Sequence, residues 1–526
     1  MDECEIGNPS ATADVHSYLE KADRYSAKLP PPNSVADGAK QNHLEGTTAL
    51  AVGLHMELGS PQFRRTLIFL FLVFLVTFSW GERFKNFLKS DSRTIDEIVY
   101  YRLARHLNES PPSYHACDYA KDLIEERGRK LPGYFTKPLF KHPPLVPVLM
   151  AAFLKIFGQS PISAYTISLL FGVAMIPLVY LLGSVLFDRR VGILAALLMY
   201  VEPINIICSQ KLWLDTALAF FSVLALYLFV VGIKREKDNY FIASGVATGF
   251  AVLTKYPGML SLFIIFLYAF LCRRELFKNK KFVLSLTLPF FMLLPWGYVN
   301  YRFYKFDFIL KNETMHRFYS IFFSPGVILF ILCLSAVSIV VFYKRFWHAP
   351  LEAKNGRLLK LGIRMLSLLA FLWMIQGAVI HIFSFSCLPE TSWSHSAFHE
   401  NLPWYFYFHQ LVLFSPMYVL SYLAFFLFYE KKKQDSFFVK LSVVMILGFY
   451  VFWGNYQSRY ILASIPFLVI LAAAVWIKMF DFIVQQKNEG LKFLGQLALL
   501  LILVVIFWKT HYVNQLISFP HDMCYF

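Results

Sequence analysis

Long apolar stretches separated by short basic clusters are the feature that most constrains how this chain can fold. Of its 526 residues, 57% are hydrophobic and only 16% are charged, which leaves too little polar surface for a soluble protein of this size. Stretches of about 17 to 25 apolar residues are long enough to cross a bilayer core of about 30 Å as helices. Transmembrane β-barrels would instead show alternating segments of about ten residues. The sequence therefore predicts an all-α, polytopic membrane protein.

Hydropathy predicts about thirteen transmembrane helices along the chain. The predicted spans lie near residues 66–81, 161–186, 191–208, 212–232, 239–254, 257–271, 281–299, 321–343, 364–385, 408–429, 438–454, 459–478 and 492–508. No fixed-period repeat is visible. The seven cysteines are scattered without metal-binding spacing, so they predict neither a zinc site nor a disulfide framework.

The basic residues predict how the chain is oriented. Arg64 and Arg65 precede the first span, and the later Lys and Arg clusters follow even-numbered spans. By the positive-inside rule these positions are cytosolic, and the formal net charge of +16 thus reflects topology rather than nucleic-acid binding. We expect residues 1–63 to be a disordered cytosolic tail, 64–510 the transmembrane catalytic domain and 511–526 an external tail. Residues 82–160 form the first external loop, where we expect the chemistry.

Asp96 and Glu97 stand side by side in this loop, in a stretch whose apolar spacing predicts a helix along the membrane surface. Adjacent helical residues point about 100° apart, so both acids cannot face one substrate atom equally. One is then a working base and the other a support. On spacing alone, a solvated polar face explains them equally well.

Further along the loop, Lys141 and His142 precede Pro143 and Pro144, which fix the local backbone. The functional interpretation is that this stretch holds a positively charged side chain near a phosphate. Without other evidence, a lysine that snorkels to lipid head groups is the more common explanation.

Two more charged positions lie at predicted external helix ends. Lys211 and Asp215 are four residues apart, as in an i,i+4 ion pair, yet an acid one turn inside a membrane helix favours a functional role. Lys255 precedes a predicted tight turn at 256–258 and could hold a lipid phosphate or snorkel. The small residues before it predict close helix packing.

Late in the chain, Arg459 and Tyr460 begin the twelfth predicted span, and the planar guanidinium of Arg459 suits phosphate oxygens. Anchoring at the membrane interface is the alternative. Trp404 and Tyr405 belong to an aromatic group before the tenth span, which is also what an interfacial aromatic belt would place there.

Together these stretches resemble the polyprenyl-phosphate-sugar-dependent glycosyltransferases of family 39, which have the GT-C membrane fold and include protein O-mannosyltransferases and lipid A aminoarabinose transferases. The resemblance spans roughly residues 66 to 480 and keeps the order of the motifs. The matching motifs are "DEIVYY" from Asp96, "HPPL" from His142, "KLWLD" ending at Asp215, "GVATGFAVLTK" ending at Lys255, "HENLPWYFYF" from His399 and "RYILASIPFLVIL" from Arg459.

The resemblance implies inverting transfer of a sugar, mannose or another hexose, from a dolichyl- or polyprenyl-phosphate donor to an acceptor hydroxyl. Asp96 would be the general base, with Glu97 or Asp215 positioning the base or the acceptor. The residues implied to bind the donor phosphate are Lys255 and Arg459, together with Lys141 and His142. The residues implied to bind substrate are Tyr100, Trp404, Tyr405 and Tyr460.

The sequence leaves the sugar open, and it leaves open whether the acceptor is a protein, a lipid or a glycan. Asp96 and Asp215 could hold a divalent metal, but Lys and Arg alone can meet the phosphate charge, so we expect no required cofactor. The membrane would be that of the endoplasmic reticulum in a eukaryote and otherwise the plasma membrane. The rival classes are a secondary transporter, whose ions would lie near the bilayer midplane, and an inactive lipid-binding scaffold.

Overall fold

The computed structural model describes residues 61–89, 95–109, 114, 142–305, 405–426, 433–453 and 457–517. These residues form helices and connecting turns and contain no strand, so the predicted all-α class is confirmed. Phe69–Phe526 forms one compact unit, and Met1–Ile68 forms a separate one of which only the start of the first helix is described. The predicted spans at 321–343 and 364–385 lie outside the described residues, and so do the 1–60 part of the N-terminal tail and positions 518–526.

The helices follow one another with short connections. In chain order they are α3 Pro61–Lys89, α4 Ile95–Glu109, α6 Leu145–Phe157, α7 Pro161–Leu186, α8 Arg189–Tyr200, α9 Pro203–Ser209, α10 Leu214–Arg235, α11 Asn239–Thr254, η2 Tyr256–Gly258, α12 Met259–Cys272, η3 Arg274–Lys278, α13 Lys280–Tyr304, α18 Phe406–Phe414, α19 Met417–Phe426, α20 Lys433–Phe452, η5 Ser458–Ser464, α21 Ile465–Val484 and α22 Glu489–Ile517.

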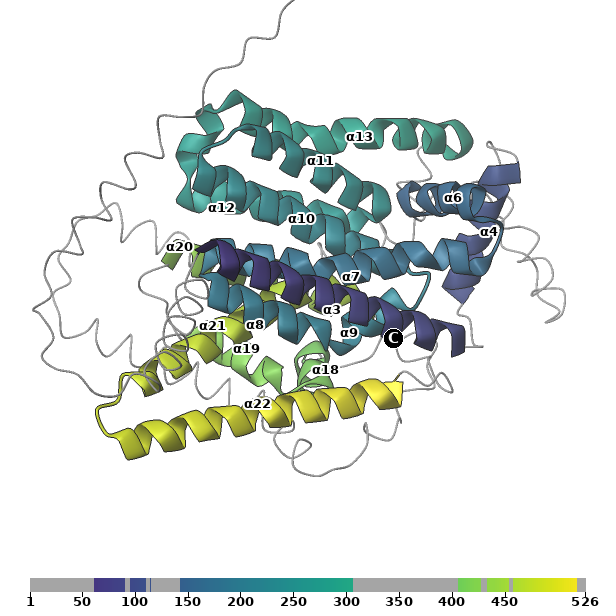
Figure 1. Ribbon diagram of the computed structural model, residues 1–526. Helices are drawn as coiled ribbons and strands as arrows, with labels where there is room; N and C mark the ends of the chain where they lie inside the picture. Colours follow the sequence, from purple (N-terminus) through teal and green to yellow (C-terminus); the bar gives the residue numbers. More distant parts are fainter. Residues whose placement is uncertain are drawn as a thin grey trace, which may run out of the picture. The chain divides into compact units, whose positions relative to one another are not determined.

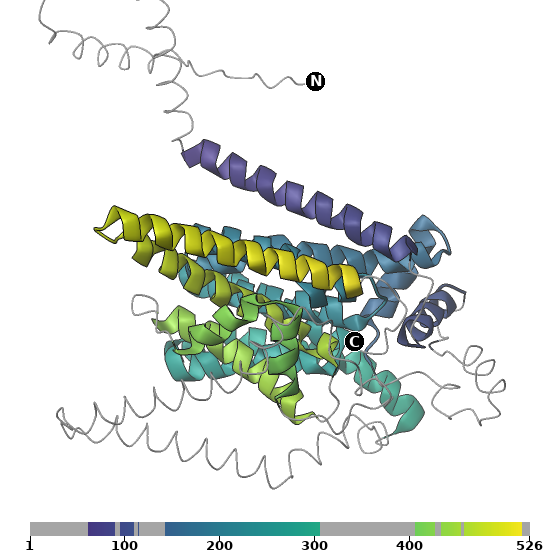
Figure 2. The same ribbon diagram turned by 90° about the horizontal axis from the view of Figure 1, so that it is seen from below.

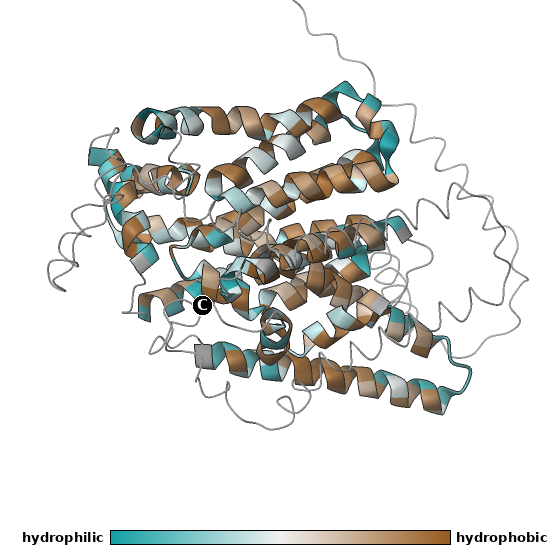
Figure 3. Cartoon of the chain, turned by 180° about the vertical axis from the view of Figure 1, so that it is seen from behind, coloured by the Kyte–Doolittle hydropathy of each residue, from teal (hydrophilic) through white to brown (hydrophobic). Residues whose placement is uncertain are grey.

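Seven of the described helical segments are long and apolar enough to cross a membrane: α3, α7, α10, α13, α20, α22 and the continuous segment of η5 with α21. The bent pair of α8 and α9 makes an eighth if it counts as one span. The helices carry apolar residues along their middle parts and polar ones near their ends (Figure 3). The predicted span at 161–186 coincides with α7. The chain is thus a multi-pass membrane protein.

Two predicted continuous spans are interrupted. The predicted helix at 191–208 bends by 57° between α8 and α9, and the predicted helix at 408–429 is split between α18 and α19. A proline stands at each break, Pro203 and Pro416. Proline lacks an N–H and disfavours helical geometry in the residue before it, which accounts for both interruptions. Glu202 caps the new helix α9, because its carboxylate accepts a hydrogen bond from the Asn205 N–H at 2.6 Å.

The interior of the bundle is formed mainly by α7, α10 and α21, whereas α13 and α22 are largely exposed. In the most apolar stretch of each span, 89% of the residues are buried for the segment that contains α21, but only 11% for α22. Such an apolar, exposed helix suits contact with lipid chains. Small residues allow close packing as predicted: a side chain at Gly245 of α11 would collide with the backbone of Ser285 in α13.

The predicted helix in the first loop is present as α4, and helix α6 follows directly after Pro143 and Pro144. Figures 1 and 2 show both at one end of the long helices. The Asn108 side chain of α4 donates to the backbone oxygen of Ala151 in α6 at 2.9 Å, and the Tyr101 hydroxyl donates to the backbone oxygen of Gln159 at 3.1 Å. These bonds fix α4, and with it the two adjacent acids, against the bundle.

Candidate functional site

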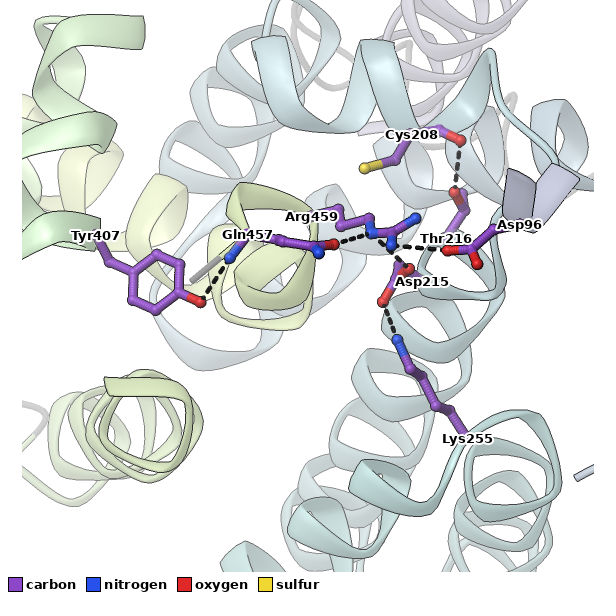
Figure 4. A network of polar contacts seen from close by, with 8 residues as sticks. All are labelled: Asp96, Cys208, Asp215, Thr216, Lys255, Tyr407, Gln457 and Arg459. Carbon is purple, nitrogen blue, oxygen red and sulfur yellow. Dashed lines mark hydrogen bonds and ion pairs between the residues drawn. The ribbon is translucent and has the colours of Figure 1, made fainter. Parts of the chain in front are cut away.

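Four of the residues singled out in the sequence meet at the beginning of α10 (Figure 4). Asp96 comes from the first turn of α4, Asp215 from the first turn of α10, Lys255 from the end of α11 and Arg459 from η5. They are separated by as many as 363 positions in the chain. The fold therefore assembles the site from four distant segments.

The four side chains form one chain of alternating charges. Arg459 Nη2 lies 2.8 Å from Asp96 Oδ2, and Arg459 Nε lies 3.9 Å from Asp215 Oδ2. The other oxygen of Asp215 accepts a hydrogen bond from Lys255 Nζ at 2.8 Å. The Asp96 side chain is 40% exposed, whereas that of Asp215 is 4% exposed. Asp96 is therefore the carboxylate that a substrate can reach.

The turn that carries Lys255 is built by its own sequence. Lys255 ends α11 in extended conformation, and the Gly258 N–H donates to the Lys255 backbone oxygen at 2.9 Å. A Cβ atom at Gly258 would collide with the backbone of Ala251, so only glycine fits there. The tight turn predicted at 256–258 is confirmed as η2.

The position of Asp215 is likewise fixed by residues next to it in the sequence. α10 begins directly after Trp213, and the Thr216 hydroxyl donates to the backbone oxygen of Cys208 at 2.9 Å, which ties the first turn of α10 to α9 (Figure 4). A carboxylate in the first turn of a helix also interacts favourably with the helix dipole. These contacts fix Asp215 between the two cations.

Aromatic rings and a glutamine hold the cations in place. Arg459 Nε donates to Gln457 Oε1 at 2.7 Å, and its guanidinium lies 4.5 Å from the centre of the Trp213 ring. Lys255 Nζ lies 4.6 Å from the centre of the Tyr460 ring, which the Arg459 guanidinium also approaches, at 5.6 Å. Such contacts between a cation and a ring stabilise the positive charge without neutralising it.

Glu97 occupies a different environment from its neighbour Asp96. Its carboxylate Oε2 lies 3.8 Å from Lys211 Nζ, and the side chains of both residues are only 1% exposed. The Leu212 N–H donates to Glu97 Oε1 at 3.2 Å. The angular separation predicted for the two adjacent acids is thus observed: one faces the four-residue cluster and the other is buried against the segment before α10.

The alternative of an i,i+4 pair between Lys211 and Asp215 is wrong. α10 begins at Leu214, so Lys211 precedes the helix and the four-residue spacing does not place the two side chains on one face. Lys211 pairs with Glu97 instead, and Asp215 pairs with Lys255. Local spacing could not reveal this, since each of the true partners lies in another segment.

The remaining predicted site residues are placed less closely around the cluster. Tyr100 is 8% exposed, and its ring centre lies 6.1 Å from that of His142 at the start of α6. Burial, with a smaller contribution from Asp96, raises the pKa of the Tyr100 phenol well above its usual value, so this group stays protonated. Tyr405 is 38% exposed just before α18. Lys141 and Trp404 lie outside the described residues.

Sequence reasoning missed the roles of Trp213 and Gln457. Each stands two positions before a predicted site residue, Asp215 and Arg459 respectively, but neither carries a charge that would single it out. Gln457 also links the cluster to α18, because its N–H donates to the Tyr407 hydroxyl at 3.2 Å (Figure 4). Within the described ranges, no three His, Cys, Asp or Glu side chains are grouped as metal ligands would be.

Comparison with known proteins agrees with this fold. The sequence model of the family described as dolichyl-phosphate-mannose-protein mannosyltransferase matches residues 141–298, which include Lys211, Asp215 and Lys255. An uncharacterized protein of Aquifex aeolicus (strain VF5) is 26% identical over 231 residues, which are 43% of this chain. The match spans 46% of that relative's length.

Among solved structures, ArnT from Cupriavidus metallidurans in the apo state has a TM-score of 0.50 at 14% identity, over 88% of this chain and 78% of ArnT. ArnT bound to undecaprenyl phosphate has a TM-score of 0.51 at 14% identity, over 87% and 77% of the two chains. The archaeal oligosaccharyltransferase AglB from Archaeoglobus fulgidus, in complex with an inhibitory peptide and a dolichol-phosphate, has a TM-score of 0.51 at 17% identity, over 87% of this chain and 56% of AglB.

The bundle and these likenesses define a class, namely multi-pass membrane proteins with the fold of the GT-C glycosyltransferases. Within that class, residues 141–298 carry the sequence pattern of the dolichyl-phosphate-mannose-protein mannosyltransferases. The predicted resemblance to GT-C glycosyltransferases is confirmed.

Proposed function

We propose that this protein is a membrane glycosyltransferase that moves a sugar from a polyprenyl-phosphate donor to an acceptor hydroxyl. The observation that carries the proposal is the reachable carboxylate of Asp96 in direct contact with Arg459, one ion pair away from Asp215 and Lys255. A base next to fixed cations suits a reaction in which a hydroxyl loses a proton while a phosphate departs. The mannosyltransferase sequence pattern supports mannose or another hexose as the sugar.

Asp96 is the proposed general base. An alcohol is a weak nucleophile until a base accepts its proton during bond formation. The oxygen of the acceptor then forms a bond to the anomeric carbon while the bond from that carbon to the phosphate oxygen breaks. The proton passes to Asp96, and the electron pair leaves with the lipid phosphate. A single displacement of this kind inverts the configuration at the anomeric carbon.

Lys255 and Arg459 are the proposed partners of the departing phosphate. Lys255 Nζ has three N–H donors, of which Asp215 accepts one, and Arg459 contacts Asp96 through Nη2 and Asp215 through Nε. Fixed donors in a poorly hydrated site stabilise the negative charge that develops on the leaving group. A phosphate that competes for Arg459 also weakens its hold on Asp96, which leaves that carboxylate a stronger base. This arrangement requires no metal.

The two other acids have positioning roles in this proposal. Asp215 is nearly inaccessible and lies between two cations, so we assign it to holding Lys255 and Arg459 in place. Glu97 is buried against Lys211 and fixes the orientation of α4, from which Asp96 projects. Lys141 and His142 are proposed to assist phosphate binding, and Tyr100, Trp404, Tyr405 and Tyr460 to line the substrate site.

The proposed membrane arrangement follows the basic clusters, with the N-terminus in the cytosol and the site on the external or luminal side. The membrane is that of the endoplasmic reticulum if the host is eukaryotic and otherwise the plasma membrane. Two similar structures support a lipid-linked donor: ArnT bound to undecaprenyl phosphate, and AglB in complex with a dolichol-phosphate and an inhibitory peptide. The acceptor would be a hydroxyl of a protein, a lipid or a glycan.

Asp96→Asn tests the proposal. The purified full chain in lipid nanodiscs is given a panel of polyprenyl-phosphate hexoses and hydroxyl acceptors, and released polyprenyl phosphate is measured. Loss of a general base lowers turnover about 10²- to 10⁴-fold, while donor binding is retained. Glu109→Gln is the matched control, because Glu109 lies on the same helix with its side chain 55% exposed. Near-normal turnover by Asp96→Asn eliminates Asp96 as the base.

A further inference from the structure

Tyr450 is a buried tyrosine near the end of α20 whose hydroxyl has no hydrogen-bond partner in the part of the chain that the structure describes. The residue is only 3% exposed. Buried hydroxyl groups are nearly always hydrogen-bonded, because loss of water without a replacement partner is unfavourable. A hydroxyl that departs from this rule is a candidate for contact with something that binds later.

Other buried tyrosines of the bundle follow the rule. Tyr165 donates to the Arg83 backbone oxygen at 3.3 Å, and Tyr422 donates to the Phe408 backbone oxygen at 2.9 Å. Tyr418 donates to the Glu202 carboxylate at 2.7 Å. Tyr450 therefore differs from buried tyrosines that have the same chemistry and comparable burial.

The position of Tyr450 relates it to the four-residue cluster. Its ring is stacked on that of Tyr460, with ring centres 5.6 Å apart and planes inclined by 24°. Tyr460 is the ring that both Lys255 and Arg459 approach. Asp215 is among the groups that act electrostatically on Tyr450. Tyr450 is thus stacked on the ring that both cations approach.

We propose that the Tyr450 hydroxyl donates a hydrogen bond to the phosphate of the lipid-linked donor. This inference rests on the proposed function. The oxygens of an ionised phosphate accept hydrogen bonds. The phenol of a tyrosine can donate one to them without adding a further charge to the site. Asp215, which interacts electrostatically with Tyr450, already accepts a hydrogen bond from Lys255. An incoming anion drawn to the two cations would supply the acceptor that the described residues do not offer to Tyr450.

The test uses Tyr450→Phe and Tyr422→Phe in the purified full chain in nanodiscs. Both tyrosines are 3% exposed and lie in helices of the same bundle, but only Tyr422 has a protein partner in the described structure. The probe is undecaprenyl phosphate without a sugar, with undecaprenol as its uncharged counterpart. Tyr450→Phe is expected to weaken binding of the phosphate by about tenfold or more, as loss of a hydrogen bond to a charged group does, and to leave undecaprenol binding unchanged.

Thermal unfolding separates this role from a structural one. Tyr450→Phe removes an unpartnered hydroxyl, so its unfolding temperature should equal or exceed that of the unmodified protein. Tyr422→Phe removes the hydrogen bond that Tyr422 donates to the Phe408 oxygen and should lower the unfolding temperature while phosphate affinity stays the same.

The possible outcomes are distinguishable. One outcome is that the unmodified protein binds undecaprenyl phosphate and that Lys255→Ala, but not Tyr450→Phe, weakens this binding. In that case the inference on Tyr450 fails and the proposed function stands. An effect of Tyr450→Phe only on the choice among sugar donors assigns the hydroxyl to the sugar and overturns the inference. Equal weakening of phosphate and undecaprenol binding likewise overturns it. If the unmodified protein binds neither probe, the proposed function fails, and the inference fails with it.

Discussion

The two ends of helix α10 carry the same kinds of residue in opposite circumstances. At its start, Asp215 pairs with Lys255 with side chains 4% and 13% exposed, and the neighbouring Lys211 pairs with Glu97 at 1% and 1%. At its other end, Lys234 pairs with Asp435 of α20 at 2.7 Å, with side chains 41% and 11% exposed, so this pair is only partly buried. Arg190 and Asp481 similarly join α8 to the far part of α21, with side chains 56% and 36% exposed.

The difference in burial shows which charged residues a gain in stability does not explain. An exposed pair loses little hydration and contributes at most about 1 kcal/mol, so Lys and Arg at that end can serve topology alone. A buried pair must offset a large loss of hydration, and apolar residues of similar size often stabilise a fold as well or better. Charges concentrated and buried at one end of a membrane bundle therefore indicate function.

The largest effect on stability is expected at the buried pair. Glu97→Gln leaves the Lys211 charge buried without its acid, and loss of one partner of such a pair destabilises a fold by about 3–5 kcal/mol. We expect a clear drop in the unfolding temperature of the purified protein. The double variant Glu97→Leu with Lys211→Met removes both charges and should recover most of that loss. If Glu97→Gln unfolds at the same temperature as Glu109→Gln, the pair does not anchor α4.

The long-range partners of these charges mark the limit of what could be predicted from the sequence. Hydropathy predicts the helices, because a segment that crosses a membrane must be apolar whatever it packs against; the prediction for 161–186 therefore coincides with α7. The breaks at Pro203 and Pro416 are also local effects, and proline rules could have predicted them. Pairing is different. Lys211 finds its acid 114 positions away in the sequence, and spacing alone favoured its neighbour Asp215.

The candidate site shows the same division. Asp96, Asp215, Lys255 and Arg459 could be selected individually, because each is a charged residue at the predicted external side, away from the cytosolic basic clusters that serve topology. The motifs that contain these residues follow one another in the order of the family they resemble, which predicted that the residues share a site. The structure places them in one chain of ion pairs. Tyr450 could not be selected, since a tyrosine near the end of an apolar helix is ordinary, and only the structure shows that its hydroxyl has no partner among the described residues.

An intermediate effect is expected at Lys255, and it falls on binding rather than on stability. Lys255→Ala removes one of the two cations proposed to hold the donor phosphate, so the affinity for undecaprenyl phosphate should fall about 10- to 100-fold, as expected for loss of a charge-assisted hydrogen bond. Equilibrium binding to the protein in nanodiscs measures this. Lys234→Ala, at the opposite end of α10, is the matched control and should bind as the unmodified protein does. Equal losses in both variants would assign the effect to general charge.

The smallest effect is expected at the exposed pair of Arg190 and Asp481, although its geometry is the better one. Arg190 Nη1 and Nη2 donate to the two carboxylate oxygens at 2.6 and 2.9 Å, whereas Lys211 and Glu97 are 3.8 Å apart. If hydration rather than geometry decides the strength of these pairs, Arg190→Ala should change stability by no more than about 1 kcal/mol. Salt should reduce even that difference, because exposed charges are screened. Unfolding temperatures of the variant and the unmodified protein at low and high salt measure both effects. A loss at Arg190→Ala that equals the loss at Glu97→Gln would show that the two ends are held in the same way, and burial would then no longer distinguish the site from the rest of the bundle.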